Sequence, residues 1–138
     1  MKLLTIYIIN RMNTITKNRI GNILNYFLSA ILIISGTLKL VGFKPYKEMI
    51  LRLSPHYYEN IYLLGIVAIV AGVLFSVRKT FVFGFIATLV FLGGAISAHM
   101  QIGDNFITQI VFVYLTVFTA FLKKPEWFKS KKQIPKNI

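Results

Sequence analysis

The apolar residues of the chain fall into four long stretches that polar and charged residues separate. The stretches cover approximately residues 23–41, 61–77, 81–100 and 106–122. Each lacks both the alternation of a barrel strand and the polar face of a soluble amphipathic helix. A helix of roughly 17–20 residues is about 26–30 Å long, which is close to the hydrocarbon thickness of a bilayer. The pattern therefore predicts an all-α protein that forms a transmembrane four-helix bundle.

The connections between these stretches are short, with one exception. Arg78 and Lys79 separate the second and third stretches, which predicts a tight antiparallel hairpin. The longest connection, residues 42–60, contains Pro45 and Pro55. Between the two prolines, four apolar residues have the i, i+3, i+4, i+7 spacing of a helix: Tyr46, Met49, Ile50 and Leu53. We predict a short interfacial helix between the first two spans, with an irregular loop as the alternative.

The distribution of charge predicts an orientation in the membrane. The net charge is +12, from 16 Lys and Arg residues against 4 Asp and Glu residues. Twelve of the 16 cations precede the first stretch, separate the second from the third, or follow the fourth. By the positive-inside rule, both termini are predicted to be cytoplasmic. Membrane topology thereby explains the positive net charge, and nucleic acid is not expected as a partner.

Three segments follow from this reading: a basic N-terminal extension (1–22), a four-span membrane domain (23–122) and a basic C-terminal tail (123–138). The tail is expected to lie on anionic lipid headgroups. The apolar run Leu3–Ile9 is too short to span a bilayer, and no small-residue cleavage site follows it, so a cleaved signal peptide is not expected. Met1 and Met12 both stay open as the start of the protein.

Small residues mark the expected helix contacts, because helices in lipid associate by close backbone approach. The second stretch has one such stripe: Gly65, Ala68, Gly72 and Ser76. The third has another: Gly84, Ala87, Gly94 and Ala98. We expect the two stripes to face each other. For Gly93 and Gly94, packing is preferred over a flexible point or a close approach to a cofactor.

Polar residues in the spans gather near the predicted outer face. Lys39 is the only cation within a stretch, and Ser35 shares its helix face. His99 ends the third stretch, Asp104 follows in the next connection, and Gln109 begins the fourth. These five residues are the candidate pocket, with a Lys39–Asp104 ion pair that offsets the cost of burying the lysine. The alternatives are that Lys39 extends to the headgroups and that His99 contacts water.

Several chemistries are excluded by residue type. The chain has no cysteine, which rules out disulfides, thiol nucleophiles, cysteine-ligated zinc and iron–sulfur clusters. No second ligand stands at helical spacing from His56 or His99, so a metal or haem site is not expected. A redox role would therefore depend on a small bound cofactor or a partner protein.

Two motifs resemble a known family. Ser35–Leu40, SGTLKL, resembles the SGxxKL element of the DoxX-like membrane proteins. Gly94–Asp104, GAISAHMQIGD, resembles the GAxxAHxxxGD element of the same family. The matching positions are Ser35, Gly36, Lys39, Ala95, His99, Gly103 and Asp104. Asn105 stands where the family often has a proline.

The resemblance implies a small four-helix protein of the cell membrane, most simply a bacterial inner membrane. Some DoxX-like relatives act with quinone-linked redox systems, which implies an accessory or subunit of such a system. In that case Lys39 and His99 would hydrogen-bond a quinone carbonyl, and Asp104 would orient His99. The alternative is a non-catalytic membrane scaffold or assembly factor, and a small transporter is a third option. Whether the chain is catalytic, has a membrane or soluble redox partner, or forms a homo-oligomer stays open.

Overall fold

The computed structural model describes residues 2–128, with side chains from residue 13 onward. All the regular secondary structure in this part of the chain is helical, which confirms the predicted all-α class. Four long helices dominate it: α1 (Lys2–Leu40), α4 (Ile61–Ser76), α5 (Phe81–Gln101) and α6 (Ile107–Lys123). Three short helices complete it: α2 (Lys44–Leu53), α3 (Pro55–Glu59) and the 3-10 helix η1 (Pro125–Phe128).

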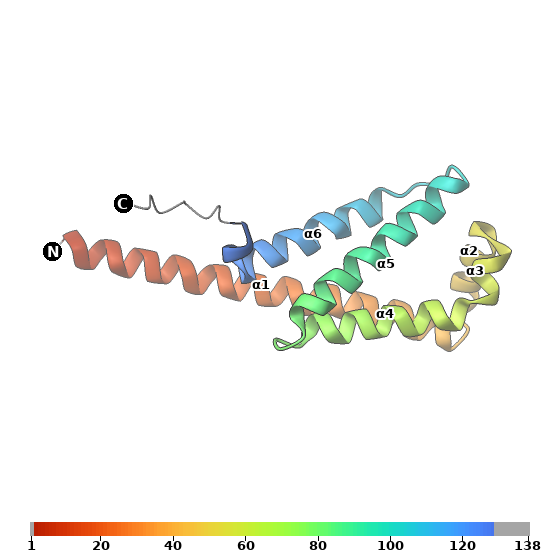
Figure 1. The fold of residues 1–138 in the computed structure, drawn as a ribbon, viewed down its shortest axis with the longest axis horizontal. Helices are drawn as coiled ribbons and strands as arrows, with labels where there is room; N and C mark the ends of the chain where they lie inside the picture. Colours follow the sequence, from red (N-terminus) through yellow and green to blue (C-terminus); the bar gives the residue numbers. More distant parts are fainter. Residues whose placement is uncertain (1, 129–138) are drawn as a thin grey trace, which may run out of the picture.

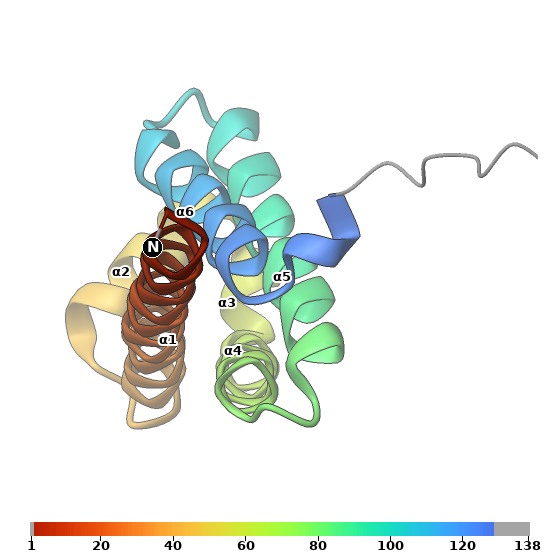
Figure 2. The same ribbon diagram turned by 90° about the vertical axis from the view of Figure 1, so that its left-hand side faces the viewer.

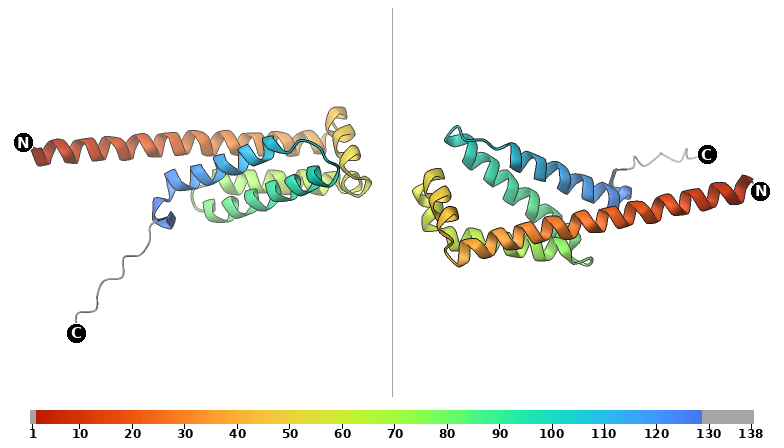
Figure 3. Two further views of the ribbon diagram at one scale, coloured as in Figure 1. Left: turned by 90° about the horizontal axis from the view of Figure 1, so that it is seen from above. Right: turned by 180° about the vertical axis from the view of Figure 1, so that it is seen from behind.

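The four long helices pack in a ring and alternate in direction along the chain. α1 contacts α4 and α6, and α5 contacts the same two helices from the other side (Figure 2). α2 and α3 lie at one end of the ring, together with the connection from α5 to α6 (Figure 1). Toward that end α5 and α6 diverge from α1 and α4, as Figure 1 and the view from behind in Figure 3 show. The molecule is thus closed at one end and widened at the other.

Glycines explain why α1 and α4 form the most extensive pair. A Cβ atom on Gly36 of α1 would meet the backbone oxygen of Gly65 and the side chain of Ile69. A Cβ atom on Gly72 of α4 would meet the carbonyl oxygen of Ser29 on α1. Gly65 and Gly72 of the second stretch therefore face α1, and the expectation that these two glycines face α5 is wrong. Close backbone approach requires small residues at the contact, and at Gly65 the facing residue of α1 is Gly36.

α5 approaches α4 closely only near the turn that joins them. A Cβ atom on Gly84 would overlap the α4 backbone at Leu74 and Phe75. Farther along α5, a Cβ atom on Gly93 or Gly94 would meet nothing within 4 Å. The expected packing role of these two glycines is therefore wrong. They lie where α5 has already diverged from its neighbours.

The first helix is longer than expected. α1 continues through residues 22 and 23, where a basic extension was expected to meet the membrane domain. Asn13–Leu40 and α5 are each long and apolar enough to span a membrane, whereas α4 and α6 are shorter apolar helices. In the expected C-terminal tail, α6 ends at Lys123 and η1 follows at once. The remainder of that tail, residues 129–138, lies outside the described residues.

The predicted short helix between the first two stretches is confirmed as α2. Pro45 stands in its first turn, and its apolar face is turned inward, with Ile50 only 3% exposed. A second short helix, α3, was not predicted. Its first turn forms because the Ser54 hydroxyl accepts the backbone N–H of His56 at 3.2 Å, a common N-cap interaction. Together α2 and α3 cover the widened end of the ring.

Candidate functional site

The widened end holds a partly open cavity of about 500 Å³, which we call the Lys39 cavity. All four long helices and both α2 and α3 contribute to its wall. Most of the wall is aliphatic or aromatic. Its polar members are Ser35, Lys39, Tyr46, Tyr57, Thr88, His99, Gln109 and Thr116. A cavity of this size and composition is typical of sites for small organic ligands.

Lys39 lies in the last turn of α1 and is only 6% exposed. Its Nζ atom donates to the hydroxyl of Ser35 at 2.7 Å and to the Ser35 carbonyl at 3.3 Å. The same atom lies 4.9 Å from the ring centre of Tyr46 and 5.8 Å from that of Phe91. Aromatic faces attract cations, so α2 and α5 both help to hold this lysine inside. The interpretation that Lys39 extends to the surface does not fit its burial.

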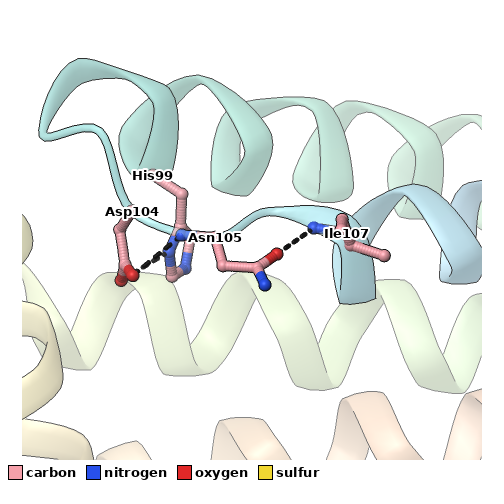
Figure 4. Close-up of polar contacts among 4 residues, drawn as sticks. All are labelled: His99, Asp104, Asn105 and Ile107. Atoms are coloured by element: carbon pink, nitrogen blue, oxygen red, sulfur yellow. Dashed lines mark hydrogen bonds and ion pairs between the residues drawn. The ribbon is translucent and has the colours of Figure 1, made fainter.

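His99 and Asp104 form a hydrogen-bonded pair at the end of α5 (Figure 4). His99 Nδ1 lies 3.2 Å from Asp104 Oδ2, and His99 is 7% exposed whereas the Asp104 side chain is 50% exposed. When Nδ1–H donates to the carboxylate, the neutral imidazole has Nε2 as an acceptor. His99 lines the cavity, and Asp104 stands outside the wall.

The loop after α5 holds this carboxylate in place. Gly103 has a φ of 66°, which allows the chain to reverse after α5. The backbone N–H of Asn105 donates to Asp104 Oδ1 at 2.8 Å, and the Asn105 side chain in turn accepts the N–H of Ile107 at 2.8 Å (Figure 4). The Asn105 N–H holds the pKa of Asp104 below its usual value. The contact with His99 acts in the same direction, and partial desolvation opposes it.

Two further polar atoms in the cavity wall are buried and have no hydrogen-bond partner in the described part of the chain. They are the hydroxyl of Thr88 on α5 and Oε1 of Gln109 on α6. Thr88 is 1% exposed. Buried polar groups without partners are rare in folded proteins and often indicate a bound water or ligand.

The structure thus brings Ser35, Lys39, His99 and Gln109 to one cavity, and Asp104 to its outer edge. The expected ion pair between Lys39 and Asp104 is wrong: the lysine donates to Ser35, and the carboxylate contacts His99. The reason is local. Asp104 follows a helix-ending glycine that turns it back toward the last turn of its own helix, where His99 lies.

No match to the chain was found among protein-family models, curated proteins or solved structures. The geometry of the chain itself therefore carries the functional argument.

Other residues of the cavity were not singled out from the sequence. Thr88 and Phe91 lie in an otherwise apolar stretch, and nothing in their spacing marks them. The apolar face of α2 was recognised, and all four of its residues line the cavity: Tyr46, Met49, Ile50 and Leu53. That face therefore covers the site, a role that its spacing alone did not indicate.

A second buried polar cluster, which was not predicted from the sequence, lies at the closed end. Asn25 of α1 is 0% exposed and donates to the carbonyl of Phe75 on α4 at 2.9 Å. Lys123 of α6 donates to Asn25 Oδ1 at 2.6 Å and lies 4.7 Å from the ring centre of Phe81 on α5. We call this the Asn25–Lys123 cluster. A lone asparagine within an apolar stretch was the available signal.

Proposed function

We propose that the chain is a multi-pass integral membrane protein of the DoxX-like type, a transmembrane four-helix bundle with both termini in the cytoplasm. Its large apolar side chains support this, because many of them face outward on the long helices: Ile23, Phe83, Val90, Ile107 and Tyr114 are all more than half exposed. Only about a third of the most apolar window of α1 or α5 is buried, unlike a soluble core helix. Lipid would cover this outward apolar surface.

The positions of the charged residues support the orientation. The closed end holds the turn between α4 and α5 and the last turn of α6 (Figure 1). Arg78 and Lys79 lie in the α4–α5 turn, and Lys123 and Lys124 lie at the end of α6. Lys17 and Arg19 lie on α1, before Gly21, which is close to Lys123. Three of the four acidic residues belong to the other end: Glu48, Glu59 and Asp104. The closed end is therefore the cytoplasmic end of the proposal. A bacterial inner membrane is the proposed location.

Single cysteines test this topology, because the chain has none of its own. In right-side-out membrane vesicles, an impermeant maleimide should label Lys47→Cys at once and Lys79→Cys only after permeabilisation. Lys79 is exposed and Lys47 is partly exposed. Labelling of both from one side would contradict the four-span arrangement.

We further propose that the protein is an accessory or subunit of a membrane redox system that uses a lipophilic, oxygen-bearing ligand, with a quinone as the expected member. The observation that carries this is the Lys39 cavity, an apolar chamber with a buried amine and two unpartnered polar atoms. Lys39 Nζ and the Thr88 hydroxyl are donors for a ligand oxygen, and His99 and Gln109 provide acceptors. When bound, a quinone would supply the electron-carrying group.

Purification in mild detergent tests the ligand. Organic extracts of the wild-type protein should contain a lipophilic oxygen-bearing compound in near-stoichiometric amount, detected by mass spectrometry. Lys39→Met together with His99→Gln should lose it, whereas the exposed control Lys44→Gln should keep it. Equal amounts in all three proteins would show that the compound comes from bulk lipid.

The alternative function is a scaffold or assembly factor, and the Asn25–Lys123 cluster is the observation that favours it. This cluster joins α1, α4, α5 and α6 without bordering the cavity, so it serves the fold alone. A scaffold needs such a cluster and no ligand. If a cavity variant still co-purifies with the same partner protein and supports normal respiration, the scaffold is the correct function.

A further inference from the structure

We propose that the Lys39 cavity takes its ligand as an anion: a lipophilic acid whose ionised oxygen pairs with Lys39 Nζ and whose apolar body fills the remaining space. The inference rests on the proposed ligand-binding function and narrows it from oxygen-bearing ligands in general to acidic ones. It would apply equally to a carboxylate on an acyl chain and to an acidic hydroxyl on a quinone ring.

The acidic side chains of the chain all have basic partners other than Lys39. There are only four, and all lie in the described region. Each is 3.2–3.8 Å from a basic side chain other than Lys39: Glu48 from Lys44, Glu59 from His56, Asp104 from His99 and Glu126 from Lys124. No acidic side chain of this protein therefore serves as the counter-ion of Lys39.

In place of a counter-ion, Lys39 has hydrogen bonds within its own helix and contacts with two aromatic rings. An ammonium has three donors, and the protein acceptors within reach are two oxygens of the same residue, Ser35. The ring faces of Tyr46 and Phe91 add attraction but no negative charge. A buried cation is stable only when it is paired and its hydrogens are satisfied. Because Lys39 borders the cavity, an anionic occupant of the cavity would supply the missing negative charge.

The residues that line the cavity indicate the chemistry of the rest of the ligand. Around Lys39 the wall is largely apolar, with Leu32, Ile50 and Phe91 from three different helices. A small inorganic anion would leave this surface without a partner, whereas an alkyl chain or ring would cover it. The hydroxyl of Thr88, which has no protein partner, is a further donor for an oxygen of the ligand. The apolar cavity wall and the positive charge of Lys39 together fit a ligand that is an amphipathic acid.

Three probes with the same alkyl chain test the charge preference in the full-length protein. Dodecanoate, dodecanol and dodecylammonium differ only in the head group. The protein is placed in nanodiscs of phosphatidylcholine, which has no net charge to compete, and empty nanodiscs correct for partitioning. Dodecanoate should bind saturably, with a Kd lower than that of dodecanol by about tenfold or more. Dodecylammonium should not bind above the empty-disc level. Equal Kd values for dodecanoate and dodecanol would overturn the proposal.

Variants assign that preference to one residue. Lys39→Met should bind dodecanoate and dodecanol equally, Lys39→Arg should retain the preference, and the exposed control Lys44→Gln should match wild type. Retention of the anion preference by Lys39→Met would overturn the proposal. The probe comparison on wild-type protein stands on its own if a variant does not fold.

A further pair of probes separates this proposal from the proposed function. A ubiquinone analogue with a short tail is neutral, and an alkyl-hydroxynaphthoquinone is ionised at neutral pH. Binding of the hydroxynaphthoquinone alone supports both proposals. If both quinones bind equally and dodecanoate does not bind, the proposal of an anionic ligand is overturned and the quinone-linked function is retained. If dodecanoate binds and neither quinone does, the proposal of an anionic ligand is retained and the quinone-linked function is overturned.

Discussion

The two ends of the molecule each hold a buried or half-buried lysine at the end of a helix, yet the two lysines differ in what surrounds them. Lys123 at the closed end has the amide oxygen of Asn25 as its partner, and through Asn25 it connects α6 to α1 and α4. Lys39 at the widened end bonds only within its own helix and borders a cavity. Where the helices are close together, the lysine hydrogen-bonds to another helix; where they diverge, the lysine hydrogen-bonds to its own helix beside a cavity.

The largest expected effect tests why the ring is closed along α1 and α4. Gly36→Ala would place a methyl group against the backbone oxygen of Gly65 and the side chain of Ile69. Since backbone cannot yield as a flexible side chain does, we expect the free energy of unfolding to fall by about 3 kcal/mol. Unfolding in detergent, followed by loss of helical circular dichroism, measures this.

Gly93→Ala on α5 is the matched control, because its added methyl group would meet nothing within 4 Å. It should leave the stability unchanged or raise it by up to about 1 kcal/mol, as alanine favours helix over glycine. A similar loss in both variants would show that the loss at Gly36 does not come from its contact with α4.

The second effect tests the Asn25–Lys123 cluster as a joint between helices. Asn25→Ala removes the bonds to Lys123 and to the Phe75 carbonyl and leaves both partners unsatisfied. The expected loss is about 2 kcal/mol in the same unfolding measurement. Asn18→Ala on the exposed surface of α1 is the control and should have no measurable effect. A neutral Asn25→Ala would mean that the cluster does not hold the closed end together.

The third prediction compares the effects of replacing the two lysines on the free energy of unfolding. Lys123→Met breaks a bond between helices, so we expect a loss of about 1 kcal/mol. Lys39→Met removes a buried cation without an acidic partner, so in ligand-free protein the stability should stay the same or rise by about 1 kcal/mol. Measured side by side, the two substitutions should have opposite or clearly unequal effects. Equal losses would contradict the distinction between the two ends.

The contrast also explains which features the sequence could predict. The length and apolar character of the stretches indicated the helices of the ring, and the spacing of Tyr46 to Leu53 indicated α2. These are properties of single segments. Which helix faces which was mispredicted, because the stripe of Gly65 and Gly72 is equally compatible with α1 and α5 until Gly36 is seen opposite it.

The candidate site shows the same limit. Ser35, Lys39, His99 and Gln109 stand out because polar residues are rare in apolar stretches, and all four line the cavity. Thr88 was overlooked since threonine is tolerated in apolar helices, and only its unpartnered hydroxyl makes it notable. The partner of Asp104 depended on the turn at Gly103, which positions the carboxylate toward His99. Pairing within a loop depends on backbone direction, and residue type alone does not specify that direction.

The smallest effect concerns the pH dependence of the widened end, which the closed end should not share. The Asn105 N–H and His99 hold the pKa of Asp104 below its unfolded value, so the ionised carboxylate stabilises the α5–α6 turn. That contribution is complete above the unfolded pKa and is lost as the pH falls through the lower, folded value. Amide hydrogen exchange at Asn105 and Ile107 should therefore speed up as the pH falls below about 4, after correction for the intrinsic rate. Exchange at Lys124, whose N–H donates to Ala120 at the closed end, is the internal reference. Asp104→Asn should remove most of the difference, and an unchanged pH response in that variant would assign the effect to another group.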